Sequence, residues 1–236
     1  DLNKYGFNQV TSEKTMGLYQ NNNASQLAIL TDGIYKNIDF TVNTLDNQTS
    51  LLNALSGLNL TYFKRAPSQL FDQDAKSLNQ RVAKNVSNSN KDFVTITYRV
   101  IAPPHSQLYV SVPNISWSDD NNHSLSITVN GVTRNQVTDN TFDFFDLGYF
   151  ETESMVTIKL SFPGNKVISF DNTSFYALDT QNYQIAMNTI NERDSKVTTS
   201  NNKVFVDYSS KTNASLFFTI PYDKGWTATI NHKKVK

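Results

Sequence analysis

Strict alternation of apolar and polar residues dominates the middle of the chain. In residues 92–100, DFVTITYRV, every second side chain is apolar, as in a strand with one buried and one exposed face. The same period of two recurs further along the chain. The pattern predicts antiparallel strands at 93–100, 107–112, 124–129 and 155–162, packed as one sandwich.

Turn residues separate these strands. Asn130-Gly131 lies between two alternating runs and is typical of a type I′ hairpin turn, which needs positive φ at both central residues. Pro163-Gly164-Asn165 ends the last of the four strands. Residues 91–170 are therefore predicted to form an antiparallel, jelly-roll-like β-sandwich within a mostly β chain.

The first third, residues 1–90, has a mixed α/β pattern. Short apolar runs at 15–20 and 26–30 indicate strands, and a leucine stripe predicts a helix from Asp46 to Ser56. Asp46 or Asn47 is expected to cap this helix and Gly57 to close it in the left-handed conformation. A second helix is predicted at 70–84, before a polar linker at 85–91.

The last third, residues 171–236, predicts a helix followed by an antiparallel sheet. Asp179 or Thr180 is expected to cap a helix over 182–193. Its apolar face recurs at i, i+3, i+4 and i+7, at Tyr183, Ala186, Met187 and Ile190. Strands are predicted at 203–208, 215–220 and 226–230.

The C-terminal residues raise a question of their own. Asp223-Lys224-Gly225 predicts a turn, so residues 226–230 are expected to pair with 214–220. Trp226 is then expected to be buried against the helix at 182–193. Val235 would begin a further strand with no residues to complete it, so we expect the chain to be a piece of a longer protein.

Composition excludes several classes of function. The formal net charge is zero, with 21 basic and 21 acidic residues, which argues against a nucleic-acid partner. The chain has no cysteine, so disulfides, thiolate metal sites and cysteine nucleophiles are excluded. No run of 18 apolar residues predicts a membrane span.

Catalytic motifs are absent from the sequence. The three histidines, His105, His123 and His232, lie in polar or turn segments and are not spaced as metal ligands. No HExxH, Walker A or GxSxG motif occurs. We therefore expect no catalytic residue, no metal and no cofactor in this chain.

One loop carries a candidate carbohydrate site. In SWSDDNNHS, Trp117 lies close to Asp119 and Asp120. An exposed tryptophan offers a stacking face for a sugar, and carboxylates accept hydrogen bonds from hydroxyls. Calcium is a further ligand to consider, although the acids lack the alternate spacing of a calcium loop. The other interpretation is a solvated hairpin loop whose tryptophan packs on the sheet edge. Trp226 is interpreted in the same way, as a packing residue rather than a ligand platform.

Several phrases follow one another in a distinctive order. They are LYQNNNASQLAIL at 18–30, NQTSLLNALSG at 47–57, QLYVSVP and ITVNG in the middle, FYALDTQNYQIAMNTINER at 175–193 and SLFFTIPYDKGWTATINHKKV at 215–235. Taken in this order, they resemble the bacterial YfhO membrane protein family. At Asn231-His232 this chain departs from the Asp-Gly usual in that family. The resemblance covers most of the chain, with the middle weakest.

The resemblance implies a function that the residues alone do not. YfhO-like proteins are similar to polytopic glycosyltransferases that use polyprenyl-phosphate sugars and glycosylate teichoic acids outside the cell. For this chain, the resemblance implies an extracytoplasmic, non-catalytic domain in the cell envelope of a Gram-positive bacterium. The expected partners are the protein's own transmembrane region and an acceptor, either cell-wall glycan or teichoic acid. The alternative is a free-standing surface sandwich that binds carbohydrate or a host ligand.

Overall fold

The chain forms two compact units. The computed structural model describes residues 7–14, 16–21, 23–31, 38, 40, 41, 43–73, 92–117, 119, 123–138, 143–164, 168–193, 195–210 and 213–235. The terminal unit comprises Asp1–Ile38, Leu51–Asn59 and Ile185–Lys236, and the sandwich unit comprises Asp39–Ser50 and Leu60–Gln184. This division differs from the sequence-based one at 90/91 and 170/171, because strands from the two ends of the chain pair with each other.

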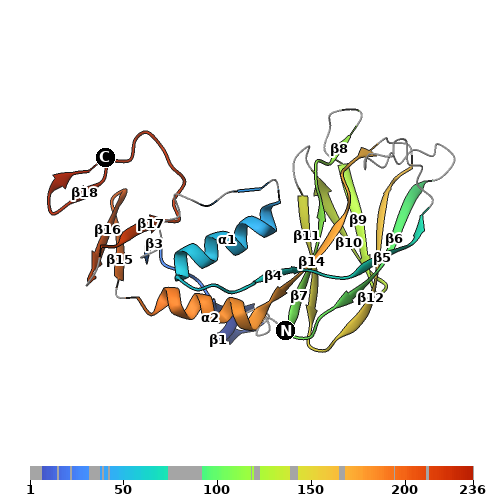
Figure 1. Cartoon of the computed structure of the whole chain (residues 1–236), viewed down its shortest axis with the longest axis horizontal. Helices are drawn as coiled ribbons and strands as arrows, with labels where there is room; N and C mark the ends of the chain where they lie inside the picture. The colour runs from blue at the N-terminus through green and yellow to red at the C-terminus, as the bar shows by residue number, and fades with distance from the viewer. Residues whose placement is uncertain are drawn as a thin grey trace. The chain divides into compact units, whose positions relative to one another are not determined.

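Two antiparallel sheets form the sandwich unit (Figure 1). The five-stranded sheet has the order β10 (Val132–Thr138), β9 (His123–Val129), β12 (Ser154–Pro163), β6 (Phe93–Ala102) and β5 (Ser68–Gln73). The four-stranded sheet has the order β11 (Asp143–Phe150), β7 (Ser106–Val112), β14 (Ser174–Asp179) and β4 (Phe63–Arg65). A short pair, β8 (Ser116–Trp117) and β13 (Ile168–Ser169), completes the unit.

The four strands predicted from alternation are confirmed. They correspond to β6, β7, β9 and β12. Three of them lie in the five-stranded sheet and β7 lies in the other sheet, so the alternating apolar faces meet in one core. The predicted mostly β, antiparallel sandwich fold is confirmed.

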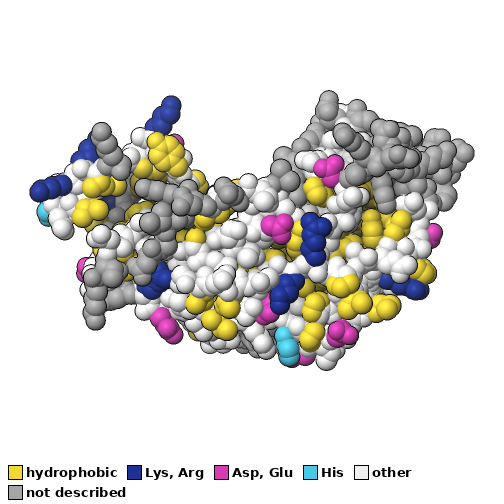
Figure 2. Space-filling model, viewed as in Figure 1, with side chains coloured by type: hydrophobic (Ala, Val, Ile, Leu, Met, Phe, Trp, Pro, Cys, Tyr) yellow, Lys and Arg dark blue, Asp and Glu magenta, His cyan; other side chains and the backbone are white. Residues whose placement is uncertain are grey.

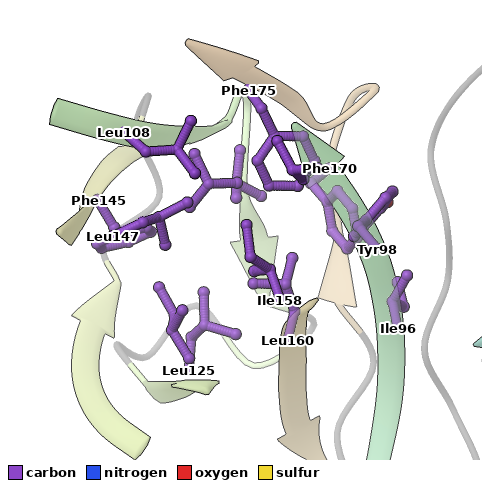
Figure 3. Packing of buried hydrophobic residues seen from close by; sticks show 14 of the residues in the cluster. Ile96, Tyr98, Leu108, Leu125, Phe145, Leu147, Ile158, Leu160, Phe170 and Phe175 are labelled. Carbon is purple, nitrogen blue, oxygen red and sulfur yellow. The ribbon is translucent and has the colours of Figure 1, made fainter. Parts of the chain in front are cut away.

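The core lies between the two sheets (Figure 3). Ile96 and Tyr98 of β6, Ile158 and Leu160 of β12 and Leu108 of β7 belong to one buried cluster. Burying one such side chain stabilises the fold by roughly 1.5–3 kcal/mol. The alternation that predicted the strands is therefore also what holds the two sheets together.

The predicted Asn-Gly turn is confirmed between β9 and β10. Asn130 has φ +45° and Gly131 has φ +89°. Asn130 also accepts a hydrogen bond on Oδ1 from the backbone N–H of Thr157, at 3.1 Å. The turn is thus tied to β12 as well as joining its own two strands.

Helix α1 (Thr44–Ser56) confirms the first predicted helix but not its cap. The N-cap is Asn43, whose Oδ1 accepts hydrogen bonds from the backbone N–H groups of Leu45 at 2.9 Å and Asp46 at 3.1 Å. Asp46 and Asn47 lie inside the first turns of the helix, so their proposal as caps was wrong. The helix begins two residues earlier because Asn43 supplies the acceptor. Gly57 has φ +74° and closes the helix as predicted.

The helix predicted at 70–84 is wrong where it can be checked. Residues 70–73 belong to β5, which pairs with β6, and residues 74–84 lie outside the described residues. Ladder hydrogen bonds to the long, well-formed β6 outweigh the weak helical propensity of this segment. A register shift between Leu70 and Asp72 leaves Phe71 as a bulged residue.

The terminal unit is built from paired strands. The pairs are β1 (Phe7–Glu13) with β2 (Met16–Asn21), β3 (Ala28–Thr31) with β17 (Ser215–Phe218), β15 (Ser195–Ser200) with β16 (Lys203–Tyr208), and β18 (Thr229–Ile230) with β19 (Lys233–Lys234). Strand β3 is buried along its whole length. The strands predicted at 15–20, 26–30 and 203–208 are therefore present, with small shifts at their ends.

Arg193 joins separate segments of the terminal unit. Its Nη1 donates to the carbonyl oxygen of Leu30 and its Nη2 to that of Ser56, both at 2.6 Å. Ser56 is the last residue of α1, where helix carbonyls lack an internal partner and favour a cation. Nothing in the local sequence pattern identifies this role.

Helix α2 (Thr180–Asn191) confirms the predicted C-terminal helix. Asp179 is the cap, because its Oδ1 accepts a hydrogen bond from the backbone N–H of Asn182 at 3.0 Å. Of the predicted apolar face, Ala186, Met187 and Ile190 are buried.

The predicted pairing at the C-terminal end is wrong. Strand β17 pairs with β3, and β18 pairs with β19. The buried apolar β3 offers β17 a partner that residues 226–230 cannot match. The side chain of Trp226 is 48% exposed, so its predicted burial is wrong too. The turn at Asp223–Gly225 is present: Trp226 donates its backbone N–H to the carbonyl oxygen of Asp223, at 3.1 Å.

Candidate functional site

Trp117 lies in the core of the sandwich unit. Its side chain is 3% exposed, and its ring packs edge-on against His123 and Phe162 at centroid distances of 4.7 and 6.4 Å. The indole N–H donates to Oγ1 of Thr138 at 2.7 Å. The ring therefore has no open face for a sugar, which favours the packing interpretation of this residue.

Of the two acids near Trp117 in the sequence, the structure describes one. Oδ1 of Asp119 lies 2.7 Å from Nε2 of His123, so this carboxylate already has a partner. Asp120 lies outside the described residues. The structure thus brings Trp117, Asp119 and His123 together, as a packed cluster at the end of β9 rather than as an open sugar site.

The outer face of the five-stranded sheet is a stronger candidate. Its central side chains come from the polar positions of the alternating strands, and the strand register aligns them in rows between two apolar pairs, Met155 with Ile101 and Pro163 with Phe93. We call this set the hydroxyl face. Its rows are Asn135, Ser126, Ser161 and Thr95, then Thr133, Thr128, Lys159, Thr97 and Asp72, then Thr157, Arg99 and Gln69.

Part of the hydroxyl face is satisfied internally. Ser126 donates to Oδ1 of Asn135 at 2.7 Å, and the hydroxyls of Thr128 and Thr133 lie 2.8 Å apart. These bonds hold the β9–β10 side of the face in one arrangement. The side chains of Thr97 and Thr157 make no hydrogen bond within the described part of the chain, so their hydroxyls are open to a ligand.

Arg99 is held in place by an aromatic ring. Its guanidinium carbon lies 3.7 Å from the centroid of the Phe71 ring, a cation–π contact that restricts the side chain while leaving its N–H groups at the edge of the plane. Arg99 and Phe71 are both exposed. A planar, pre-positioned guanidinium suits recognition of phosphate or carboxylate through two parallel hydrogen bonds.

Lys159 adds a second cation near Arg99. Register pairs Lys159 with Thr97, two residues from Arg99 on the neighbouring strand, so the two side chains are diagonal neighbours on one face. Asp72, opposite Thr97, supplies the one acid of these rows. With two cations and one acid in these rows, the face favours an anionic, hydroxyl-bearing ligand. Elsewhere on the visible described surface, acidic and basic side chains are interspersed (Figure 2).

The sequence contained the signal for this face without revealing its extent. The alternation in residues 92–100 predicted one exposed face for this strand, and Thr95, Thr97 and Arg99 lie on it, but their alignment with β9, β10 and β12 depends on long-range register.

The described residues were also searched for metal sites and membrane spans. In the described ranges, no group of three or more His, Cys, Asp or Glu side chains could hold a metal ion. No helix there is long and apolar enough to span a bilayer.

Comparison with protein families decides the affiliation. The family described as bacterial membrane protein YfhO matches residues 1–236, the whole chain. The chain belongs to the YfhO family. This confirms the resemblance drawn from the sequence phrases and associates the chain with a bacterial membrane protein. Among curated proteins, none matches this YfhO chain.

Solved structures with similar folds are distant. They include a GH26-CBM35 β-(1,4)-mannanase of Podospora anserina, with 13% identity, a TM-score of 0.33, and coverage of 49% of this chain and 27% of that one. The acetyl xylan esterase Est2A of Butyrivibrio proteoclasticus has 11% identity, a TM-score of 0.31, and coverage of 50% and 32%. A Paenibacillus cycloisomaltooligosaccharide glucanotransferase has 12% identity, a TM-score of 0.31, and coverage of 49% and 18%. Likenesses at these scores carry no argument about function.

Proposed function

We propose that this chain is an extracytoplasmic, non-catalytic part of a YfhO-family membrane protein that resembles a glycosyltransferase of the cell envelope. In this role it holds an acceptor polymer, with teichoic acid as the favoured class, while the membrane part carries out glycosyl transfer. The observation that carries the proposal is the hydroxyl face, where Arg99 and Lys159 stand among free threonine hydroxyls.

The chemistry of the face supports a phosphate-bearing polyol as ligand. Arg99 is suited to a phosphodiester, because its guanidinium is pre-positioned on Phe71 at 3.7 Å. Thr97 and Thr157 offer donors and acceptors to the hydroxyls that lie between phosphates in such a polymer. The face lies on the surface of the sheet, so we expect weak binding that depends on several repeating units.

Binding to a defined polymer tests this role. We expect the chain to bind poly(glycerol phosphate), to bind uncharged dextran more weakly, and to lose affinity as salt rises. Arg99→Ala should weaken binding to the phosphate polymer by about 5-fold or more, in line with the loss of one charge-assisted hydrogen-bonding group.

A matched control separates specific recognition from charge. Arg134 is also exposed, but register pairs it with the core residue Ile127, on the opposite face of the same sheet. Arg134→Ala should leave the affinity unchanged in calorimetric titrations. Equal losses for Arg99→Ala and Arg134→Ala, or no loss for either, would contradict the proposed face.

A separate experiment tests on which side of the membrane this chain lies. Because this chain has no cysteine, Glu153→Cys would give it one exposed thiol, between β11 and β12, and any cysteine in the rest of the full-length protein would first be replaced by serine. In intact cells carrying the full-length membrane protein, a membrane-impermeant maleimide should label this residue. Labelling only after lysis would contradict the extracytoplasmic placement. Turnover of a polyprenyl-phosphate sugar by the purified chain would contradict the non-catalytic role.

A further inference from the structure

A hollow of about 390 Å³ lies beside Trp226 in the terminal unit. It is lined by residues 199–204, which comprise the turn between β15 and β16 and the adjoining strand ends, together with Trp226. All of these residues belong to the same compact unit. The hollow is separate from the hydroxyl face, which lies in the sandwich unit.

The position of Trp226 is set by a tight turn. Asp223 accepts a hydrogen bond on Oδ1 from the backbone N–H of Gly225 at 2.7 Å, and on its carbonyl oxygen from that of Trp226 at 3.1 Å. A side chain added at Gly225 would lie 3.1 Å from the carboxylate of Asp223, so glycine suits this turn. The turn presents the indole with 48% of its surface exposed, and a half-exposed tryptophan ring offers a stacking face.

The lining from the β15–β16 hairpin is polar apart from Val204. Asn201 and Asn202 have φ +49° and +60°, the left-handed conformation of a type I′ hairpin turn. With Thr199, Ser200 and Lys203, they provide amide, hydroxyl and ammonium groups. In the described part of the chain, none of these five side chains has a hydrogen-bond or ion-pair partner, so all are available to a ligand.

From this arrangement we propose that the hollow binds a single pyranose ring of a neutral sugar. The apolar face of a sugar ring packs on the Trp226 indole, and its equatorial hydroxyls exchange hydrogen bonds with Asn201, Asn202 and Ser200. The volume fits such a ligand, because small-molecule sites typically range from roughly 300 to 1,000 Å³. The lining combines these five polar side chains with Val204 and the Trp226 ring, which suits a ligand that has both hydroxyls and an apolar face.

The two tryptophans make a direct experiment possible. A ¹⁵N-labelled chain gives two indole N–H resonances, which Trp226→Phe assigns. On titration with N-acetylglucosamine, glucose or galactose, the Trp226 resonance should shift saturably for at least one sugar, and that of buried Trp117 should not. Glycerol, a polyol without a ring, should produce no saturable shift.

Variants identify the two walls of the site. Trp226→Ala should abolish the saturable shift of the Asn202 amide while leaving the melting temperature within roughly 2 °C, because the residue is exposed. Asn202→Ala should weaken the binding of the shifting sugar by about 3-fold to 10-fold. Asn8→Ala, at an exposed position of β1, is the matched control and should have no effect.

The outcomes separate this inference from the proposed function. Shifts confined to Thr97, Arg99 and their neighbours would overturn the sugar site and retain the hydroxyl face. The Trp226 shift alone would support the sugar site, and the hydroxyl face would then stand or fall by its own titration with poly(glycerol phosphate). In the full-length protein, complete protection of Trp226 from acrylamide quenching without added sugar would mean that another segment of the protein fills the hollow, and would also overturn the inference.

Discussion

Replacing Trp117 by phenylalanine should weaken folding and leave ligand binding intact. The substitution removes the indole N–H that donates to Oγ1 of Thr138 at 2.7 Å, inside a fully buried part of the core. A net hydrogen bond of this kind contributes about 1 kcal/mol. The volume left empty beside Phe162 and His123 should cost on the order of a further 1 kcal/mol.

We therefore expect Trp117→Phe to lower the free energy of unfolding by about 2 kcal/mol. At roughly 3 °C per kcal/mol, the melting temperature should fall by about 6 °C. Thr138→Val should cost about 1–3 kcal/mol, because it leaves the indole N–H without its acceptor. Thermal unfolding, followed by circular dichroism, measures the stability of these two variants and of the double variant that combines them.

The double variant isolates the hydrogen bond. If Trp117 and Thr138 act through one bond, the double variant should lose about 1 kcal/mol less than the sum of the single losses. Affinity for poly(glycerol phosphate) and for sugars should stay at the wild-type level in Trp117→Phe. A small stability loss combined with a loss of sugar binding would refute the reasoning and restore Trp117 as a binding residue.

Three further expectations follow from named contacts. Gly131→Ala should destabilise the sandwich unit by about 1–2 kcal/mol. The cost comes from backbone strain at φ +89° and not from a clash, because no atom lies within 4 Å of the added carbon. Chemical denaturation measures this loss, and an unchanged midpoint would contradict it. Arg193→Ala should destabilise the terminal unit by about 2–3 kcal/mol. Arg193→Lys should recover only part of this loss, because lysine has no planar guanidinium that can donate to two carbonyl oxygens at once. Amide hydrogen exchange in β3 measures both variants, and full rescue by lysine would argue against the two-carbonyl contact. Burial raises the pKa of Tyr98 above its ordinary value of 10.0, so the contribution of Tyr98 to stability should be constant below pH 10 and fall above it, because the tyrosine ionises first in the unfolded chain. Tyr98→Phe should reduce that fall in urea titrations at pH 9 to 11.

Local patterns predicted the sandwich because its information is local. Alternation in β6, β7, β9 and β12 marks which side chains are buried, and Asn130-Gly131 specifies its own turn through the φ values it tolerates. Helix α2 was predicted for the same reason, because its apolar spacing and its Asp179 cap lie within a few residues of each other.

The failures concern choices between distant partners. Residues 70–73 read as the start of a helix, yet pairing with β6 makes them a strand. Residues 226–230 read as the partner of β17, yet β3, nearly 200 positions earlier, takes that place. Trp226, which that pairing was expected to bury, is 48% exposed.

The candidate site was missed for a related reason. Its chemistry is spread over five strands, and only the register brings Arg99, Lys159 and the threonine hydroxyls onto one face. A run of adjacent letters such as SWSDDNN attracts attention in a sequence, but its tryptophan is a core residue. A polar strand face rich in Ser and Thr is the weaker signal that could have identified the site.

The central claim is that the chain holds a phosphate-bearing polymer on the outer face of its five-stranded sheet. Backbone amide chemical shifts, recorded during titration with poly(glycerol phosphate), test it most directly. The account predicts saturable shifts at residues 95–99 and 157–161, together with residues 69–72, and their loss in Arg99→Ala but not in Arg134→Ala. Shifts absent from these segments, or equally present in both variants, would contradict it.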